Sequence, residues 1–213
     1  HSLWFNANLE RSNTILGSDF HSWCGPDSVV ERFGGAAVHY PPGAFGQSNL
    51  EIAELIIEHV REHIPAGSRV LEFYAGVGAI GLSILQNVGE ITMNELSPNS
   101  LRGLELGLAK LGAPERAKVS LIAGEAGANR LAASDFPVVI VDPPRKGLDP
   151  ELTEHMSHHA PEGLIYISCG LESLLRDAAQ LTSRGKLRLV SLTAFNLMPF
   201  TEHVETVARF ERS

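Results

Sequence analysis

Apolar segments of strand length alternate regularly with segments of helical periodicity over residues 69–183, and this alternation limits the possible folds more than any other feature. Strands are predicted at 69–74, 91–94, 119–123, 138–141 and 164–168, and helices near 79–87, 98–111, 150–158 and 171–183. Strands that are apolar on both faces and are joined by crossover helices form a parallel sheet covered on both sides. Two final β-type segments, about 186–195 and 203–211, have no long helix between them, so we expect them to pair antiparallel at one edge.

The first 46 residues show no helical periodicity. Short β-type pieces at 3–5, 29–33 and 36–40 alternate with turn signals, a pattern typical of hairpins. A helix over about 49–64 follows, because Ser48 to Glu51 has the form of a capping box and Pro65 ends the periodic stretch. The sequence therefore predicts an α/β protein with a β-hairpin extension over residues 1–46 and a main domain over residues 47–213.

The composition excludes several classes of protein. The 213 residues are 44% hydrophobic and 20% charged, which suits a globular chain with a sizeable core and excludes a disordered or fibrous one. The longest aliphatic run, 138–141, is far shorter than the roughly 18 apolar residues of a membrane helix, so no membrane association is expected. Cys24 and Cys169 are the only cysteines, which argues against a disulfide scaffold and for an intracellular, reducing compartment.

The net charge bears on possible partners. Its formal value is −8, from 17 basic and 25 acidic residues, so the chain has no general attraction to a phosphate backbone. If nucleic acid is a partner, local or additional cations must bind it. Arg145, Lys146, Arg176 and Arg102 are the candidates for local cations.

A glycine-rich turn joins the strand at 69–74 to the helix that follows. Gly76, Gly78 and Gly81 allow a ligand to approach the backbone at the carboxyl end of this strand, where nucleotides bind. Glu95 lies nineteen residues beyond Gly76 and could accept hydrogen bonds from ribose hydroxyls, so the dinucleotide fingerprint is also satisfied. Glu72, however, would repel a pyrophosphate and attract the ammonium group of S-adenosylmethionine. We favour S-adenosylmethionine over NAD, with a purely structural turn as the remaining alternative.

Two later strands end in residues that could carry chemistry. Asp142 follows the strand at 138–141 and is fixed by Pro143 and Pro144, although a plain strand-ending turn would look similar. Cys169 ends the next strand just before a helix, whose amino terminus can lower the pKa of a thiol. Both residues open onto the crevice of the glycine turn, so we favour a nucleophile at Cys169 over a buried structural cysteine. Cys24 keeps the structural interpretation.

The segment 198–207 joins the last two strands and supplies further polar groups. Glu205 and His203 fall on the same face of an extended chain, whereas Glu202 points the other way. Either acid could act as a base, and a solvated edge-strand glutamate is the alternative.

Histidines gather at His155, His158 and His159, beside Glu154. Histidine is a frequent zinc ligand, but no cysteine lies nearby in sequence and a solvated helix face explains the cluster equally well. We therefore predict no metal site.

Four motifs in order resemble the RNA (uracil-5-)-methyltransferase family: the glycine turn from Glu72, Asp142-Pro-Pro-Arg-Lys-Gly147, Tyr166-Ile-Ser-Cys-Gly170 and Met198-Pro-Phe-Thr-Glu-His-Val-Glu205. The resemblance spans residues of about 40–210 and implies the class I fold of methyltransferases that depend on S-adenosylmethionine, Rossmann-like with a mostly parallel sheet. It also implies methylation of C5 of a uridine in RNA, either tRNA or rRNA. Oligomeric state is left open.

The resemblance assigns roles to individual residues. Cys169 would be the nucleophile and Glu205 the proton acceptor, with Arg145 and His203 as substrate contacts. The cofactor and base pocket would be lined by Gln47, Tyr74, Gly76, Gly78, Glu95 and Asp142, with Glu125 as a weaker candidate at the adenine end.

The sequence also departs from the family pattern. Ala79 stands where the family commonly has Asn, and Gly170-Leu171 follows the cysteine in place of Asn-Pro. No amino-terminal oligonucleotide-binding barrel or cysteine cluster of the kind found in many relatives is visible, which leaves three interpretations open: a missing RNA-binding portion, a minimal family member, or loss of function. Two alternatives stay open: an amino-group methyltransferase that uses the Asp142 to Arg145 turn, and a non-catalytic module that binds S-adenosylmethionine or RNA.

Overall fold

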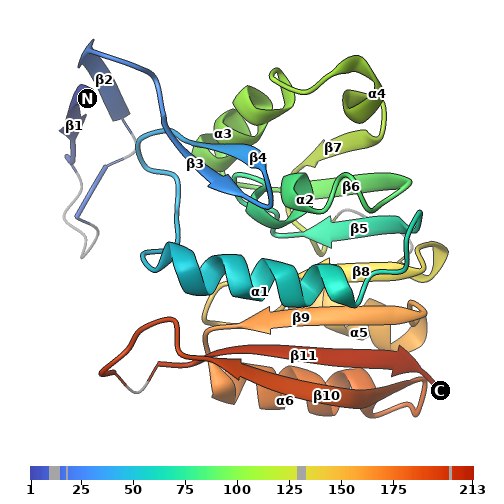
Figure 1. The fold of residues 1–213 in the computed structure, drawn as a ribbon. Coiled ribbons are helices and arrows are strands. Elements are labelled where there is room, and N and C mark those ends of the chain that lie inside the picture. The colour runs from blue at the N-terminus through green and yellow to red at the C-terminus, as the bar shows by residue number, and fades with distance from the viewer. Residues whose placement is uncertain (10–14, 18, 129–132, 202) are drawn as a thin grey trace.

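The computed structural model describes residues 1–9, 15–17, 19–128, 133–201 and 203–213. A seven-stranded sheet forms its centre (Figure 1). Its spatial order is β10 (Leu187–Phe195), β11 (Glu205–Arg212), β9 (Gly163–Ser168), β8 (Val138–Val141), β5 (Arg69–Phe73), β6 (Glu90–Glu95) and β7 (Val119–Ala123). The last five run parallel, while β11 pairs antiparallel with both β9 and β10. The predicted α/β fold, mostly parallel with an antiparallel edge, is confirmed.

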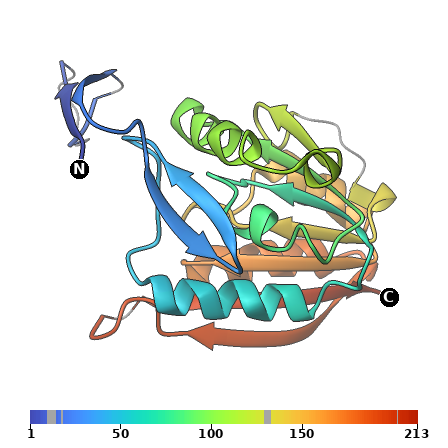
Figure 2. The same ribbon diagram turned by 45° about the horizontal axis from the view of Figure 1, so that its top comes forward.

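Helices cover both faces of the sheet, as Figures 1 and 2 show. One face packs against α1 (Leu50–Glu62), α2 (Ala79–Ser83) and α3 (Pro98–Leu108), and the other against α5 (Pro150–His158) and α6 (Leu171–Thr182). Alternation along β5 explains this arrangement, because Val70 joins the first core and Leu71 the second. All four residues of β8 are buried, as the apolar run predicts. Two short helical segments, α4 (Ala113–Arg116) and η1 (Ala133–Asp135), have no counterpart in the prediction.

The amino-terminal region forms two antiparallel hairpins, as expected, although the second strand of the first hairpin has no counterpart in the prediction. The first pairs β1 (Leu3–Ala7) with β2 (Asp19–Cys24), and the second pairs β3 (Val29–Phe33) with β4 (Ala36–Tyr40). The second hairpin packs on the main sheet layer, since Phe33 and Val38 belong to the same core as α1 (Figure 2). Its turn is also fixed to α1, because the Gly34 amide donates to the Glu54 carboxylate at 2.7 Å. The boundary at residue 46 stays a prediction.

Several helix boundaries differ from the prediction; α1 ends at Glu62 instead of residue 64, and α3 ends at Leu108 instead of residue 111. Asn49, rather than Ser48, caps α1, because its side-chain oxygen accepts the backbone N–H of Ile52 at 3.3 Å. The second helix ends at Ser83 instead of residue 87, where the chain turns through Ile84. No helix in the described ranges combines the length and the hydropathy of a membrane span.

Candidate active site

The site residues meet because parallel strands end at one edge of the sheet. The glycine turn follows β5, Asp142 follows β8 and Cys169 follows β9. The antiparallel strand β11 begins at the same edge: Thr206 pairs with Ser168, so Glu205 lies opposite Cys169. The register therefore brings a thiol and a carboxylate from distant parts of the chain together.

Cys169 and Glu205 line one small pocket together with Arg145 and His203. Glu205 is buried at 5% exposure and Cys169 is partly exposed. Leu197, Met198 and Val204 complete the wall. The enclosed space is about 10 Å³, roughly the size of a single water probe, so a planar base enters only if part of the wall moves.

The charges around Cys169 work in opposite directions. Burial, the Glu205 carboxylate and the Asp142 carboxylate raise the pKa of the thiol, while the guanidinium of Arg145, which hydrogen-bonds the sulfur, lowers it. The net direction is upward. This is opposite to the lowering expected from the amino terminus of α6, because burial and the two carboxylates raise the pKa of the thiol more than Arg145 lowers it.

Three carboxyl groups share this edge of the sheet. Burial raises the pKa of Glu205 to about 7, and Arg145 partly offsets the rise. Burial also raises the pKa of Asp142 to about 8, with a further contribution from Glu205. Glu72, at 1% exposure, has its pKa raised to about 8 by burial first and by Asp142 second. The crevice therefore holds three carboxyl groups that resist ionisation, and a bound cation would favour their ionised forms.

Glu72 is held close to the helix that follows the glycine turn. Gly81 of α2 donates a backbone hydrogen bond to its carboxylate, and a side chain at Gly81 would collide with it. Its Oε2 atom is buried without a hydrogen-bond partner among the described residues. A buried carboxyl oxygen without a hydrogen-bond partner is uncommon in folded proteins.

The glycines of the turn serve different purposes. Gly76 has φ +58°, and a side chain there would meet nothing within 4 Å, so the backbone faces open space. Gly78 has φ +83°, and a side chain there would run into Leu104 of α3. The amide of Gly76 donates to Glu95 Oε2 at 2.7 Å, while Glu95 Oε1 accepts two further backbone amides, at 2.9 and 2.6 Å. Glu95 thus connects the turn to the end of β6.

Two tyrosines and an aspartate fix the loop that carries Asp142. The Tyr74 hydroxyl donates to the Asp149 carboxylate and accepts the Asp149 amide, both at 3.1 Å. Asp177, which is 2% exposed, accepts the Leu148 amide and the Tyr166 hydroxyl, both at 2.8 Å. Asp177 is a structural residue of the site that the sequence does not predict. Tyr74 is predicted to line the cofactor pocket; its hydroxyl binds Asp149 of the loop, and its part in the cofactor pocket stays a prediction.

The remaining predicted residues are less engaged. Gln47 lies between β4 and α1, is partly exposed and makes no hydrogen bond with the described residues. Glu125 is exposed just after β7, and Glu202 lies outside the described residues. Among the residues that the structure describes, no three His, Cys, Asp or Glu side chains gather as metal ligands; His155 and His159 stack with centroids 4.8 Å apart.

A family model for tRNA (uracil-5-)-methyltransferases matches residues 32–213. The chain belongs to this family. A relative from Protochlamydia amoebophila, described as an uncharacterized RNA methyltransferase, is 33% identical over all of this chain and 55% of its own length. Another from Leptospira interrogans is 30% identical over 97% of this chain and 52% of its own. The chain thus spans about half the length of the curated relatives it matches.

Solved structures agree with the family assignment at the level of the fold. The Pyrococcus abyssi tRNA (uracil-54, C5)-methyltransferase, solved with S-adenosyl-L-homocysteine, has a TM-score of 0.82 and 24% identity over 98% of this chain and 50% of its own. The M. jannaschii TYW2 protein, solved with AdoMet, has a TM-score of 0.64 and 11% identity over 92% of each chain. Both confirm the class I methyltransferase fold. S-adenosylmethionine is the cofactor of the tRNA (uracil-5-)-methyltransferase family, as the sequence predicts.

Gly170-Leu171 replaces the family's Asn-Pro pair after Cys169, and hydrogen bonds from nearby serines fix this turn. Gly170 caps α6, where no side chain of its own is available. Ser168 binds Gly170 twice, accepting its amide at 3.1 Å and donating to its carbonyl at 3.0 Å, and Ser173 donates to the same carbonyl at 2.9 Å. These serines fix the turn after Cys169 without the family's Asn-Pro pair. Ala79 is the first residue of α2 and brings no polar side chain.

Proposed function

We propose that this chain methylates C5 of a uridine in RNA, using S-adenosylmethionine and a covalent adduct between Cys169 and C6 of uracil. The observation that carries the proposal is the pairing of Cys169 with Glu205 in one pocket, at the sheet edge where the glycine turn ends β5. Membership of the family supports the uracil-5 specificity and an RNA substrate, either tRNA or rRNA.

The residues at the glycine turn suit the proposed cofactor. S-adenosylmethionine supplies an electrophilic methyl group on a positively charged sulfur. Glu72, with its unpartnered Oε2, and Asp142 both have pKa values raised to about 8, so a positively charged ligand in the crevice would favour their ionised forms and be attracted by them. Glu95 keeps acceptor capacity for ribose hydroxyls beside the open backbone of Gly76. Gln47, Tyr74, Gly78 and the more distant Glu125 complete the proposed binding set.

Cys169 and Glu205 would act in sequence on the base. The thiol gives its proton to water, and the thiolate adds to C6 while the C5–C6 electron pair moves onto C5 and O4. C5 then takes the methyl carbon, and the electrons of the broken bond leave on the donor sulfur. Glu205 accepts the C5 proton, the C6–S bond breaks, the C5–C6 double bond returns and Cys169 leaves as thiolate.

Arg145 has two consequences for this sequence. Its guanidinium lowers the pKa of both Cys169 and Glu205, which favours the thiolate and the carboxylate that the reaction needs. Because it also contacts the sulfur in a pocket of about 10 Å³, it must turn away when the base approaches C6 to the thiolate. In the turned position Arg145 can bind the substrate, and His203 is proposed as a second substrate contact. The target uridine must leave its stack to reach this site.

The test traps the adduct with RNA that carries 5-fluorouridine, because fluorine at C5 cannot be removed as a proton. Incubation with S-adenosylmethionine should give a stable protein–RNA complex on a denaturing gel, and Cys169→Ser should give none. Cys24→Ser is the matched control and should behave as wild type, since Cys24 lies outside the site. A complex that survives in Cys169→Ser, or none in a protein that methylates uridine, contradicts the mechanism.

The same assay separates the two alternatives. Methylation of an exocyclic amine that persists in Cys169→Ser would indicate the amino-group reaction at the Asp142 turn. Binding of S-adenosylmethionine without methyl transfer to unmodified tRNA or rRNA would indicate a non-catalytic module. A further RNA-binding portion outside this sequence stays a prediction.

A further inference from the structure

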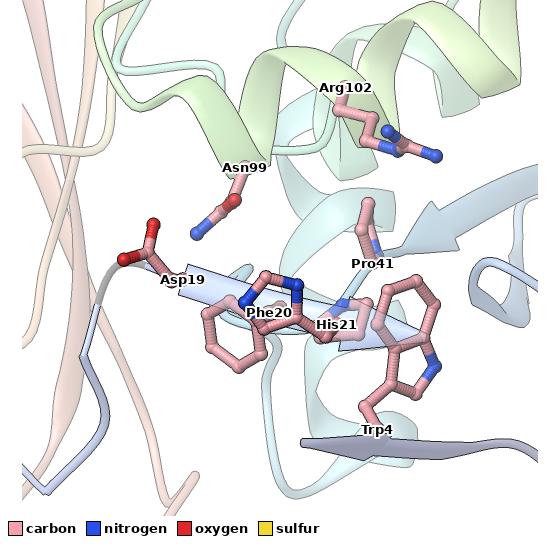
Figure 3. Close-up of a pocket in the computed structure, with 8 residues that line it drawn as sticks. Trp4, Asp19, Phe20, His21, Pro41, Asn99 and Arg102 are labelled. Carbon is pink, nitrogen blue, oxygen red and sulfur yellow. The ribbon is translucent and has the colours of Figure 1, made fainter. Parts of the chain in front are cut away.

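A second cavity, of about 260 Å³, lies between the β1–β2 hairpin and α3. Trp4 from β1 and Phe20 and His21 from β2 form one side, and Asn99 and Arg102 from α3 form the other (Figure 3). The volume is below the ~300–1,000 Å³ of pockets that enclose whole small molecules. It suits a single planar ring system better than a complete cofactor.

The cavity is separate from the pocket of Cys169. Asn99 begins α3 just after β6, whereas Cys169 follows β9, and three strand spacings separate these strands in the sheet. At about 4.8 Å per spacing, the two sites are on the order of 14 Å apart. The cavity lining also contains none of the residues proposed for S-adenosylmethionine. A molecule bound here is therefore neither the target uridine nor the cofactor.

The lining combines aromatic rings with an unused amide. Trp4 and Phe20 are partly exposed and offer ring faces, while the Asn99 side chain makes no hydrogen bond with the described residues. Gly43 permits this arrangement, because a side chain there would lie 2.6 Å from Asn99 Nδ2 and 2.7 Å from the Phe20 ring. An amide with a free donor and a free acceptor beside a ring face matches the edge and the face of a nucleobase.

A cation lies at the rim of the same cavity. Arg102 is more than half exposed and is held by Asp27 at 3.1 Å. The chain has a net charge of −8, so a phosphate must bind at local cations. A guanidinium beside aromatic rings can bind a phosphate of single-stranded RNA.

We infer that this cavity binds an unpaired nucleobase of the RNA substrate other than the target uridine, stacked on Trp4 and hydrogen-bonded by Asn99. The inference rests on the proposed function for the identity of the RNA. It extends that function by giving the β1–β2 hairpin a part in substrate recognition. The hairpin projects at the carboxyl edge of the sheet, the same edge at which the chain after β10 projects (Figure 1).

Trp4 itself provides a direct measurement. Trp4 and Trp23 are the only tryptophans, so Trp23→Phe leaves Trp4 as the sole fluorescent indole. Titration with the four ribonucleoside monophosphates and with a short unpaired oligoribonucleotide should quench this fluorescence in a saturable manner, with or without excess S-adenosylhomocysteine. Asn99→Ala in the same background should raise the Kd about 5- to 10-fold, the value of one or two hydrogen bonds. Absence of quenching, or its removal by S-adenosylhomocysteine, overturns the inference.

Kinetics with RNA separate this inference from the proposed function. If the wild type methylates RNA, Trp4→Leu should raise KM for RNA about 10-fold and leave kcat and the Kd for S-adenosylmethionine unchanged, because one stacked base is lost. Trp4→Phe, which keeps a ring, should recover most of the loss. An unchanged KM in Trp4→Leu contradicts the inference alone. If the wild type transfers no methyl group, the proposed function fails, and the fluorescence titration still decides whether the cavity binds a base.

Discussion

Replacing Glu72 by Gln should make the protein more stable at alkaline pH. The pKa of Glu72 is raised to about 8 in the folded chain, from 4.5, so the folded state keeps a proton that the unfolded state releases. The free energy of unfolding must then fall as pH rises from about 4.5 to about 8, and stay level above. At about 1.4 kcal/mol per pKa unit, the whole window amounts to on the order of 5 kcal/mol, of which about 3 kcal/mol lies above pH 6.

Urea unfolding at pH 6 and pH 9 measures this difference. At pH 6 the carboxyl group is protonated, so wild type and Glu72→Gln carry neutral side chains of the same shape and should differ by less than about 1 kcal/mol. At pH 9 the variant should be more stable by about 3 kcal/mol, with an unchanged m-value. Glu162→Gln, at an exposed position, removes the same charge and should follow wild type. The prediction is refuted if the free energy of unfolding of the wild type is the same at pH 6 and pH 9. It is also refuted if the free energy of unfolding of Glu72→Gln falls as much as that of the wild type between these pH values.

Three further predictions concern catalysis and the elements around the site. Because Glu205 has its pKa raised to about 7 and must be ionised to accept the C5 proton, kcat/KM for methyl transfer should rise more steeply below pH 7 than above it, by a further factor of about 10 per pH unit, when measured from pH 5.5 to 9. Ionisation of the Cys169 thiol, whose pKa is raised, adds the same slope on both sides, so an equal slope below and above pH 7 rules out this base. Phe200 has φ +67°, a conformation that glycine adopts without strain. Phe200→Gly should therefore stabilise the fold by about 0.5 to 1 kcal/mol, measured by thermal unfolding. Phe200→Ala keeps the strain and should show no gain. Asp177→Ala should lower the free energy of unfolding by about 3 kcal/mol, since it leaves the buried Leu148 amide and Tyr166 hydroxyl unpaired. Tyr166→Phe removes one of these hydrogen bonds and should lower it by only about 1 to 2 kcal/mol. Equal losses would contradict the role of Asp177 as the shared acceptor.

The sheet was predictable because its signals are local. Val138 to Val141 are apolar without interruption, and all four are buried between the two helical layers. The turns after β5, β8 and β9 also show themselves in sequence, through glycines and prolines. Since parallel strands end at one edge, their clustering followed from the topology alone.

The contacts that tune the site have no such local signal. Asp177 is bound to the Leu148 amide, twenty-nine residues away, and lies in a helix whose pattern marks it only as a polar position. The pKa direction of Cys169 depends on Glu205 and Asp142, which come from two other strands. The cap of α1 was misplaced by one residue because Ser48 and Asn49 are both good capping residues, and only the geometry selects between them.

The pocket of Cys169 has one firm wall and one weakly held wall. On the side of Asp142, the loop is fixed from two strands, by Tyr74 through Asp149 and by Tyr166 through Asp177.

The opposite wall is fixed mainly within itself. In its turn, the Thr201 hydroxyl donates to the Met198 carbonyl at 2.7 Å and accepts the His203 amide at 3.2 Å. Phe200 is fully exposed at this turn and Val204 is 44% exposed, so little burial opposes its displacement. Because a base cannot fit into about 10 Å³, some atoms must move, and we expect His203 and Val204 to move together with the Arg145 side chain, while Leu197, at 2% exposure, stays in the core. The carboxylates that set the charge of the site would then keep their positions while the substrate enters.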